Sequence, residues 1–180
     1  MLTPLLSDKE LFALVQTIQQ SKHIVICAHR GPDGDAVGSS LGWAEYLTNL
    51  GKDVQIVLPN PFPDFYRWLP NSHLIKFYLK HETEATRIIN HADLIFCLDF
   101  NGLSRLQEMQ TAVGKAKADK IIIDHHLDPD THIARQVISF PQKSSTSELV
   151  FRLIHTCRIL FFIRVFGIND LFCIHIHEYS

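Results

Sequence analysis

Short apolar runs recur along the chain, and each is followed by a segment whose apolar residues have helical spacing. The run at 23–29, HIVICAH, is apolar through its centre, as expected of a strand buried on both faces of a sheet. Strands that alternate with helices predict a parallel sheet. We therefore expect an α/β fold, a doubly wound and mainly parallel sheet with helices on both faces. The strands are expected at 23–29, 53–59, 93–100, 117–126 and 135–140, with a shorter one at 74–78.

The helices between these strands carry recognisable end signals. Ser7 and Glu10 form the S-x-x-E pattern of a capping box, which predicts a helix that begins near residue 8. Gly51 stands where a left-handed glycine commonly ends a helix. A Ser/Thr-rich stretch predicts the start of a last helix, with Ser144 or Ser145 as its cap. The helices are expected at 8–20, 36–50, 82–92 and 103–117, with a short one near 65–69 and the last from about 144.

Length and charge limit the classes of function. With 180 residues, 46% apolar and 20% charged, the chain suits one domain whose core needs no disulfides. A net charge of −2 argues against binding of long duplex nucleic acid, and no uncharged apolar run is long enough to span a membrane. The four cysteines form no C-x-x-C pair, which favours a reducing compartment. Because the N-terminus lacks a basic flank and a long apolar core, we expect no signal peptide and a cytoplasmic protein.

Acidic and histidine residues gather at the ends of three predicted strands. Ligands of open parallel sheets bind beyond the carboxyl ends of the strands, so we expect these clusters at one edge. Mixed carboxylate and imidazole donors without thiolates suit divalent metals such as Mn²⁺. Two such ions about 3.5–4 Å apart can activate a water for displacement at phosphorus. The clusters are His29, Asp33 and Asp35; Asp99; and Asp124, His125 and His126.

Each cluster also has an ordinary structural interpretation. Asp33, Gly34 and Asp35 are typical of a turn, Asp99 could cap a helix, and a His-His pair is commonly surface or core. A calcium loop does not fit, because its further acidic positions and terminal glutamate are missing. The shared position at three strand ends makes a metal site the better interpretation. Asp33 and Asp35 are separated by Gly34, and a turn at this glycine would allow the two carboxylates to serve different ions.

Three segments, AHRGPDGDAVGSSLG, CLDFN and IIIDHH, resemble motifs I to III of the DHH phosphoesterase family. The resemblance covers about residues 7–155 and is nearest to small oligoribonucleases and 3′-phosphoadenosine 5′-phosphate phosphatases. It implies a Rossmann-like DHH domain with two metal ions, preferably Mn²⁺. The same superfamily includes cyclic-dinucleotide phosphodiesterases, single-strand DNA exonucleases and family II inorganic pyrophosphatases.

The resemblance implies a metal ligand at each of five positions. His29 and Asp33 would bind the first ion. Asp35 and His125 would bind the second, and Asp99 would bridge the two. A hydroxide held between the ions would attack phosphorus.

Further residues would act on the substrate. The resemblance places His126 near the scissile phosphate as a donor or orienting group, and Asp124 behind a histidine ring, holding its other nitrogen. Arg105 could contact phosphate or form a structural ion pair. Ser145 and Thr146 resemble the Ser/Thr-rich stretch beside the family's active site, although an ordinary helix cap explains them equally well.

The chain departs from the family after about residue 155. We do not find the aspartate of the fourth motif, which completes the second metal site in a TDTG-like context, and Asp170 is only a nominal candidate. The tail at 156–180 shows no helical or strand period, and we expect the family's second, substrate-binding domain to be absent. We therefore divide the sequence into a DHH catalytic domain at 1–155 and an atypical tail. A shift of reading frame near codon 155 is our hypothesis, with a natural short variant as the alternative; the other two DNA frames test it.

The predicted function is hydrolysis of phosphoester bonds in short oligonucleotides or nucleoside bisphosphates by a water activated between two metal ions. A cyclic-dinucleotide phosphodiesterase is one alternative. An inactive metal-binding remnant is another, because the second metal site lacks a ligand. A nucleotide-binding Rossmann module is disfavoured, since no G-x-G-x-x-G turn follows the first strand. The expected partners are a nucleotide substrate and a second copy of the chain in a homodimer.

Overall fold

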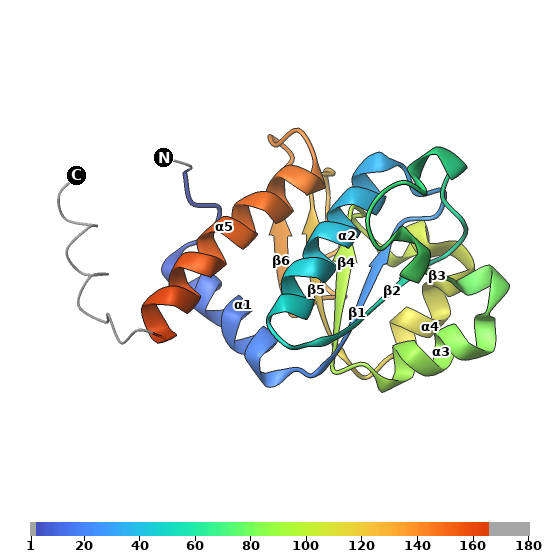
Figure 1. The fold of residues 1–180 in the computed structure, drawn as a ribbon, viewed down its shortest axis with the longest axis horizontal. Helices are drawn as coiled ribbons and strands as arrows, with labels where there is room; N and C mark the ends of the chain where they lie inside the picture. Colours follow the sequence, from blue (N-terminus) through green and yellow to red (C-terminus); the bar gives the residue numbers. More distant parts are fainter. Residues whose placement is uncertain (1–2, 166–180) are drawn as a thin grey trace.

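Residues 3–165, which the computed structural model describes, form a six-stranded parallel sheet with helices on both faces (Figure 1). The strand order is β3-β2-β1-β4-β5-β6, and every neighbouring pair is parallel. This order confirms the expected doubly wound α/β fold. The strands are β1 (His23–Ala28), β2 (Asp53–Leu58), β3 (Lys76–Phe77), β4 (Leu94–Leu98), β5 (Asp119–Asp124) and β6 (Gln136–Ser139). The helices are α1 (Asp8–Gln20), α2 (Gly34–Asn49), α3 (Glu82–His91), α4 (Gln110–Lys115) and α5 (Thr146–Val165).

The central strands are buried from both sides. Every residue of β4 is buried, and so is every residue of β1 and β5 except the first. Successive side chains point to opposite faces, so Ile24 and Ile26 join one core cluster while Val25 and Cys27 join the other. A sheet covered on both faces requires continuous apolar strands, which explains why the apolar runs predicted these strands well.

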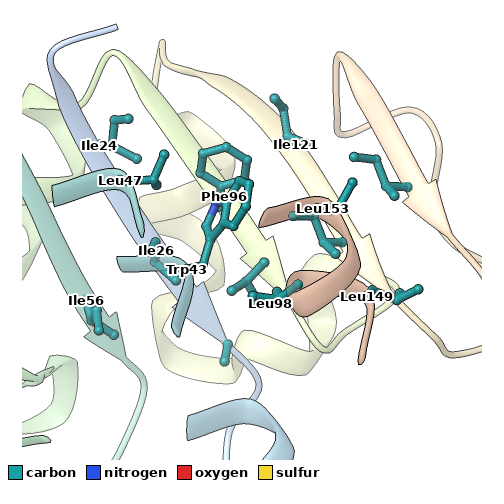
Figure 2. Packing of buried hydrophobic residues seen from close by; sticks show 14 of the residues in the cluster. Ile24, Ile26, Trp43, Leu47, Ile56, Phe96, Leu98, Ile121, Leu149 and Leu153 are labelled. Atoms are coloured by element: carbon teal, nitrogen blue, oxygen red, sulfur yellow. The ribbon is translucent and has the colours of Figure 1, made fainter. Parts of the chain in front are cut away.

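Two helical layers enclose the sheet. On one face lie α1, α2 and α5, and Figure 2 shows Trp43 of α2 against Phe96 of β4 with Leu149 and Leu153 of α5 beside them. The Trp43 and Phe96 rings meet edge-on, with 5.3 Å between their centroids. On the other face lie α3 and α4. Burying one side chain of this kind stabilises the fold by about 1.5–3 kcal/mol, so α5 is an integral part of the core.

Caps at the helix ends agree with the expected end signals. Ser7 and Glu10 form the reciprocal bonds of a capping box at the start of α1. Gly51, with φ of 78°, follows α2, and its N–H donates to the carbonyl oxygen of Thr48 at 2.9 Å. The start of α2 lies at Gly34 and not near residue 36, because the side chain of Asp33 caps the helix there.

The prediction of a single helix at 103–117 is wrong. A 3₁₀ segment, Leu103–Met109, leads into the short α4, and the backbone leaves helical geometry at Gln107 (φ 50°, ψ −115°). Tertiary structure, and not local propensity, holds a non-glycine residue at positive φ, so apolar spacing could not reveal this break. Two shorter elements also differ: the strand expected at 74–78 is reduced to β3, and the helix near 65–69 is a 3₁₀ turn at Asp64–Tyr66.

The last helix continues beyond the expected end of regular structure. α5 runs past residue 155 to Val165, through a stretch for which we expected no regular period. Asp170 and the remainder of the tail lie outside the described residues, so the hypothesis on the reading frame stays untested. Among residues 3–165, no helix is both long and apolar enough to cross a membrane.

Candidate metal centre

Three strand ends meet where the strand order reverses. After β1 the chain builds β2 and β3 on one side, and it then places β4 on the other side of β1. Ala28 therefore lies beside Leu98, and Leu98 beside Ile123. The residues that follow these strands are neighbours at the position where open α/β sheets bind ligands. The three predicted clusters come together there.

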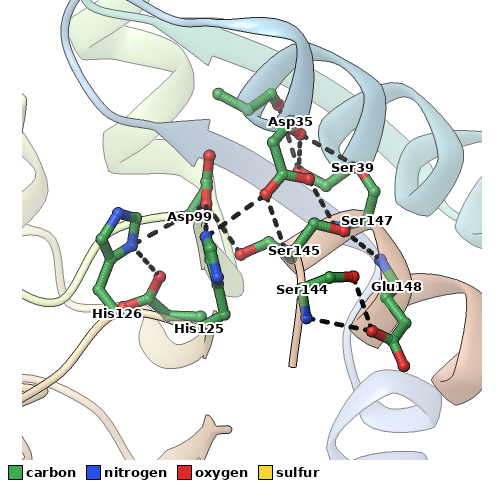
Figure 3. Close-up of polar contacts among 12 residues, drawn as sticks. Asp35, Ser39, Asp99, His125, His126, Ser144, Ser145, Ser147 and Glu148 are labelled. Atoms are coloured by element: carbon green, nitrogen blue, oxygen red, sulfur yellow. Dashed lines mark hydrogen bonds and ion pairs between the residues drawn. The ribbon is translucent and has the colours of Figure 1, made fainter. Parts of the chain in front are cut away.

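Asp99 lies at the centre of this group. Its Oδ2 is 3.5 Å from Nε2 of His29, and its Oδ1 is 3.6 Å from Nε2 of His125. Figure 3 shows the rings of His125 and His126 beside this carboxylate. Since the Asp99 side chain is only 2% exposed, its two oxygens are available mainly to these neighbours.

Two sets of potential ligand atoms share Asp99. One set contains His29, Asp33 and Asp99, and the other contains Asp99, His125 and His126. Within each set the ligand atoms lie within 4.8 Å of one another. One carboxylate common to two donor sets is what a bridging ligand between two ions requires.

The backbone of Asp99 has an uncommon conformation. Its φ is 63°, in the left-handed region that aspartate tolerates better than most residues. Its N–H donates to the carbonyl oxygen of Ile123 at 3.1 Å, and its Oδ1 accepts a hydrogen bond from the buried hydroxyl of Thr146 at 2.9 Å. Strand β5 and the start of α5 together fix this carboxylate at the end of β4.

Hydrogen bonds also orient His29 and set the charge of the site. Nδ1 of His29 lies 2.9 Å from the carbonyl oxygen of Arg30, so Nδ1 carries the proton and Nε2 is the nitrogen that faces the carboxylates. The hydrogen bond with Asp99 raises the pKa of His29, against the opposing effect of burial. Burial acts to raise the pKa of Asp99, but the bonds from His29 and Thr146 outweigh it and hold that pKa below its usual value. The site therefore favours the anionic carboxylate that a cation binds.

Asp33 lies on the turn into α2, on the His29 side of the site. Its Oδ1 accepts the N–H groups of Asp35 at 2.9 Å and Ala36 at 3.1 Å, and thereby caps α2. The same oxygen lies 4.0 Å from Nε2 of His29. The carboxylate stays largely exposed, so it can rotate toward a ligand without unburying other groups.

Asp35 lies on the His125 side and caps a different helix. Its two oxygens accept the N–H groups of Thr146 at 2.8 Å and Ser147 at 2.7 Å, at the start of α5 (Figure 3). Its Oδ2 also lies 3.7 Å from Nε2 of His125. The turn at Gly34 thus places Asp33 beside His29 and Asp35 beside His125.

Asp124 contacts the ring of His126. Its Oδ1 lies 2.7 Å from Nδ1 of His126, which leaves Nε2 of that ring for another partner. Asp124 is fully buried, and within residues 3–165 its Oδ2 has no hydrogen-bond partner. The side chain of His126 is 41% exposed, so the ring is accessible from solvent.

Ser145 and Thr146 are two of the three residues predicted to contact the substrate. The hydroxyl of each forms a hydrogen bond within the protein. Thr146 is buried with its hydroxyl on Asp99. Oγ of Ser145 accepts the N–H of Glu148 at 3.0 Å and acts as the cap of α5. Contact of either hydroxyl with a substrate therefore stays a prediction.

Arg105, the third candidate, lies on a cavity beside the metal centre. The cavity has a volume of about 360 Å³ and is lined by Arg30, Gly31, Asn60, Arg105 and Gln107. Arg30 pairs with Glu108 at 3.2 Å, whereas Arg105 forms no ion pair with any described residue. A guanidinium group without an ionic partner beside a cavity is a potential donor for an anion.

The donor set fits a divalent cation. The potential donors around Asp99 are the carboxylates of Asp33 and Asp35 and the imidazoles of His29, His125 and His126. No thiolate of the described residues is among them. Carboxylates that converge repel one another unless a cation or proton lies between them. Metal-binding histidines commonly bond their second nitrogen to a carbonyl group, as His29 does.

Comparison with known proteins agrees with this geometry. Residues 23–169 match the model of the DHH family, N-terminal domain. Over 150 residues the chain is 28% identical to the cyclic-di-AMP phosphodiesterase GdpP of Bacillus subtilis (strain 168), a match that covers 79% of this chain and 22% of GdpP. The solved structure of an exopolyphosphatase-related protein from Bacteroides fragilis is 44% identical, with a TM-score of 0.84 over 87% of this chain and 46% of that one.

Exonuclease RecJ bound to manganese shares the fold, at 16% identity and a TM-score of 0.52, over 85% of this chain and 38% of RecJ. The chain spans less than half of the length of each of these relatives.

Several contacts of the site were not foreseen from the sequence. Thr146 holds Asp99, and Asp35 caps α5, although these partners are 47 and 111 residues apart in the chain. Asn60 and Arg30 line the cavity of Arg105. The Ser/Thr-rich stretch was the available sequence signal for these contacts. It predicts where a helix starts, but it does not predict which residues that helix start contacts.

Proposed function

The chain belongs to the DHH family, and on that premise we propose that it is a metal-dependent phosphoesterase. The observation that carries the proposal is Asp99, one buried carboxylate shared by two sets of potential ligands. Hydrolysis of a phosphoester needs a nucleophile and stabilisation of charge on the phosphoryl oxygens. Two closely spaced cations supply both.

We assign the five metal ligands by the side of the site on which they lie. His29 and Asp33 are proposed for one ion, Asp35 and His125 for the other, and Asp99 for both. Mn²⁺ is the proposed metal, because it accepts mixed oxygen and nitrogen donors without thiolate. Asp35 would bind while it caps α5, so its position is set before an ion arrives.

His126 is proposed to act on the substrate. Asp124 contacts Nδ1 of His126 and fixes the orientation of the ring, so Nε2 is the nitrogen that is available to a substrate. His126 would donate through Nε2 to an oxygen of the phosphoryl group or of the leaving group. Asp124 is fully buried, so it positions the ring and does not touch the substrate.

The proposed substrates are short oligonucleotides or nucleoside bisphosphates. Such substrates carry phosphate beyond the scissile bond, and unpaired Arg105 would bind one on the cavity next to His29. A cyclic dinucleotide is the second candidate, which the likeness to the cyclic-di-AMP phosphodiesterase GdpP supports. Metal binding without turnover is the remaining alternative.

The test is AMP release from the dinucleotide pApA by the purified chain, with Mn²⁺ and with EDTA. We expect release with Mn²⁺, none with EDTA, and loss of release in Asp99→Ala. Asp119→Asn is the matched control, since Asp119 is an acidic residue at the opposite end of β5 that pairs with Arg135. Hydrolysis of cyclic di-AMP in preference to pApA would favour the second candidate. Folded protein that binds Mn²⁺ and releases nothing would overturn the phosphoesterase proposal.

A further inference from the structure

The segment between β2 and β3 keeps two large aromatic side chains on the surface. Phe65 is 66% exposed and Trp68 is 77% exposed. They are three residues apart on a 3₁₀ turn and its continuation, a spacing that favours projection to the same side. Exposing aromatic surface to water is unfavourable, so two exposed aromatic side chains on one short turn make a candidate binding surface.

The segment is held by its own hydrogen bonds, so a loose backbone does not explain this exposure. The N–H of Arg67 donates to the carbonyl oxygen of Asp64 at 3.0 Å, and its Nε donates to the Asp64 carboxylate at 2.7 Å. The hydroxyl of Ser72 donates to the carbonyl oxygen of Arg67 at 2.9 Å. A surface that is ordered before binding loses little conformational entropy when a ligand arrives.

Tyr66 joins this segment to the metal centre. A Cβ atom built on Gly34 would lie 3.0 Å from the Tyr66 hydroxyl oxygen, so the ring covers the turn that carries Asp33 and Asp35. The ring of Phe65 lies 4.3 Å from that of Tyr66, centroid to centroid. Figure 1 shows this green segment beside the N-terminal end of α2.

The start of the segment reaches the cavity that Arg105 lines. Oδ1 of Asn60 accepts the N–H of Gly31 at 2.7 Å, and Asn60 lines the cavity with Arg105. One segment therefore contacts the metal-binding turn, borders a cavity suited to phosphate, and presents exposed aromatic rings. These are the parts that a nucleotide needs, because it combines phosphate with a flat aromatic base.

We propose that Phe65 and Trp68 form a stacking platform for a nucleobase of the substrate. This inference rests on the proposed function and deepens it, because it selects nucleotides over inorganic polyphosphates. Every base has a π-face, so stacking of this kind discriminates little between base sequences. The platform would thus accept short nucleotides of any sequence.

Trp68 is itself the probe for the test. The chain has two tryptophans, and the other, Trp43, is fully buried, so a ligand on the platform changes the fluorescence of Trp68. We would titrate AMP and ribose 5-phosphate, which share the phosphate and differ in the base. We expect AMP to quench the emission and to bind about tenfold more tightly than ribose 5-phosphate. Trp68→Leu should abolish the AMP-dependent change.

A second variant tests the platform while the Trp68 probe stays in place. Phe65→Ala should weaken AMP binding about tenfold. Phe151→Ala is the matched control, because Phe151 is 61% exposed on α5 and lies outside the platform; it should leave AMP binding unchanged. Equal binding of AMP and ribose 5-phosphate, or unchanged AMP binding in Phe65→Ala, would overturn the proposal. So would a concentration-dependent shift of Trp68 emission without nucleotide, which would show that a second copy of the chain covers the aromatics.

These outcomes separate the platform from the proposed function. If AMP binds as expected but pApA is not hydrolysed, the platform holds and the phosphoesterase proposal fails. If pApA is hydrolysed with the same kcat/KM in Phe65→Ala and Trp68→Leu, the platform fails and the phosphoesterase proposal holds.

Discussion

Oγ1 of Thr146 lies 2.9 Å from Oδ1 of Asp99, and this hydrogen bond joins the first residue of α5 to the centre of the metal site. The bond forms in a fully buried position and leaves Oδ2 of Asp99 to face His29. The orientation of the shared carboxylate therefore depends on a helix that contributes no proposed metal ligand of its own.

Thr146→Val removes this hydroxyl at nearly constant shape. We expect Mn²⁺ affinity to fall at least about tenfold, as is usual when the partner of a metal ligand is lost. Isothermal titration calorimetry measures the change, and Thr146→Ser, which keeps the hydroxyl, should remain close to the parent chain. Equal affinity in the valine variant would show that the bond does not orient Asp99 for metal binding.

Mn²⁺ should stabilise the folded chain, because the ligand atoms converge only in the folded state. At a free concentration a hundredfold above Kd, the free energy of unfolding should rise by about 2.7 kcal/mol. Asp99→Asn should lose most of this gain, whereas Asp119→Asn should keep it. Thermal unfolding with Mn²⁺ and with a chelator gives both numbers, and an equal gain in the two variants would count against Asp99 as the shared ligand.

α5 should contribute measurably to global stability. Leu153 is 1% exposed in the core cluster, and Leu153→Ala should lower the free energy of unfolding by about 2–5 kcal/mol. Phe151, two residues away and exposed, gives the control, since Phe151→Ala should change stability by no more than about 0.5 kcal/mol. Urea unfolding tests both, and similar effects at the two positions would contradict the packing of α5 on the sheet.

Asp93 should make stability depend on pH in acid. Its carboxylate accepts the N–H groups of His23 at 2.8 Å and Lys22 at 2.9 Å, and these bonds lower its pKa. Because the pKa is lower in the folded state, the stabilisation is complete above the unfolded pKa of about 3.9 and is lost as pH falls through the folded value. Asp93→Asn should therefore cost about 1 kcal/mol at neutral pH and progressively less below about pH 4. A difference of the same size at both ends of that range would refute this account.

The buried thiols should be unreactive in the native protein. Burial raises the pKa of Cys157 to about 11, and the hydrogen bond with Cys97, followed by burial, raises the pKa of Cys27. Thiolate, the reactive form, is therefore scarce near pH 8. In Cys173→Ser, an aromatic disulfide reagent should modify no thiol until denaturant is added and three afterwards. Rapid modification under native conditions would show that one of these sites opens readily.

Much of the fold follows from the sequence, because burial on both faces leaves a strong mark. The central strands had to be apolar throughout, and β1, β4 and β5 were found within two residues of their ends. The three clusters were expected together because each ends such a strand. Parallel strands all deliver their last residues to one edge, so strand position was enough to bring His29, Asp99 and His125 together.

The contacts that hold the clusters could not be found in the same way. Hydrogen bonds of single side chains over long separations leave no periodic pattern, which is why Thr146 was expected at the substrate and not on Asp99. The break at Gln107 carries neither glycine nor proline, so no local signal marks it. In the sequence, Phe65 and Trp68 cannot be distinguished from core aromatic residues. Only the structure shows that their side chains are largely exposed to solvent.

The caps that Asp35 provides to α5 have a consequence for folding during synthesis. Asp35 and Ser147 are 112 residues apart, so a growing chain carries an unfinished centre until the start of α5 has been synthesised. The sheet can pair as far as β5 while the Asp35 carboxylate still lacks its backbone donors. Asp35 and Asp99 obtain their partners on α5 only after Ser147 has left the ribosome, so we expect metal capture to follow synthesis of the start of α5.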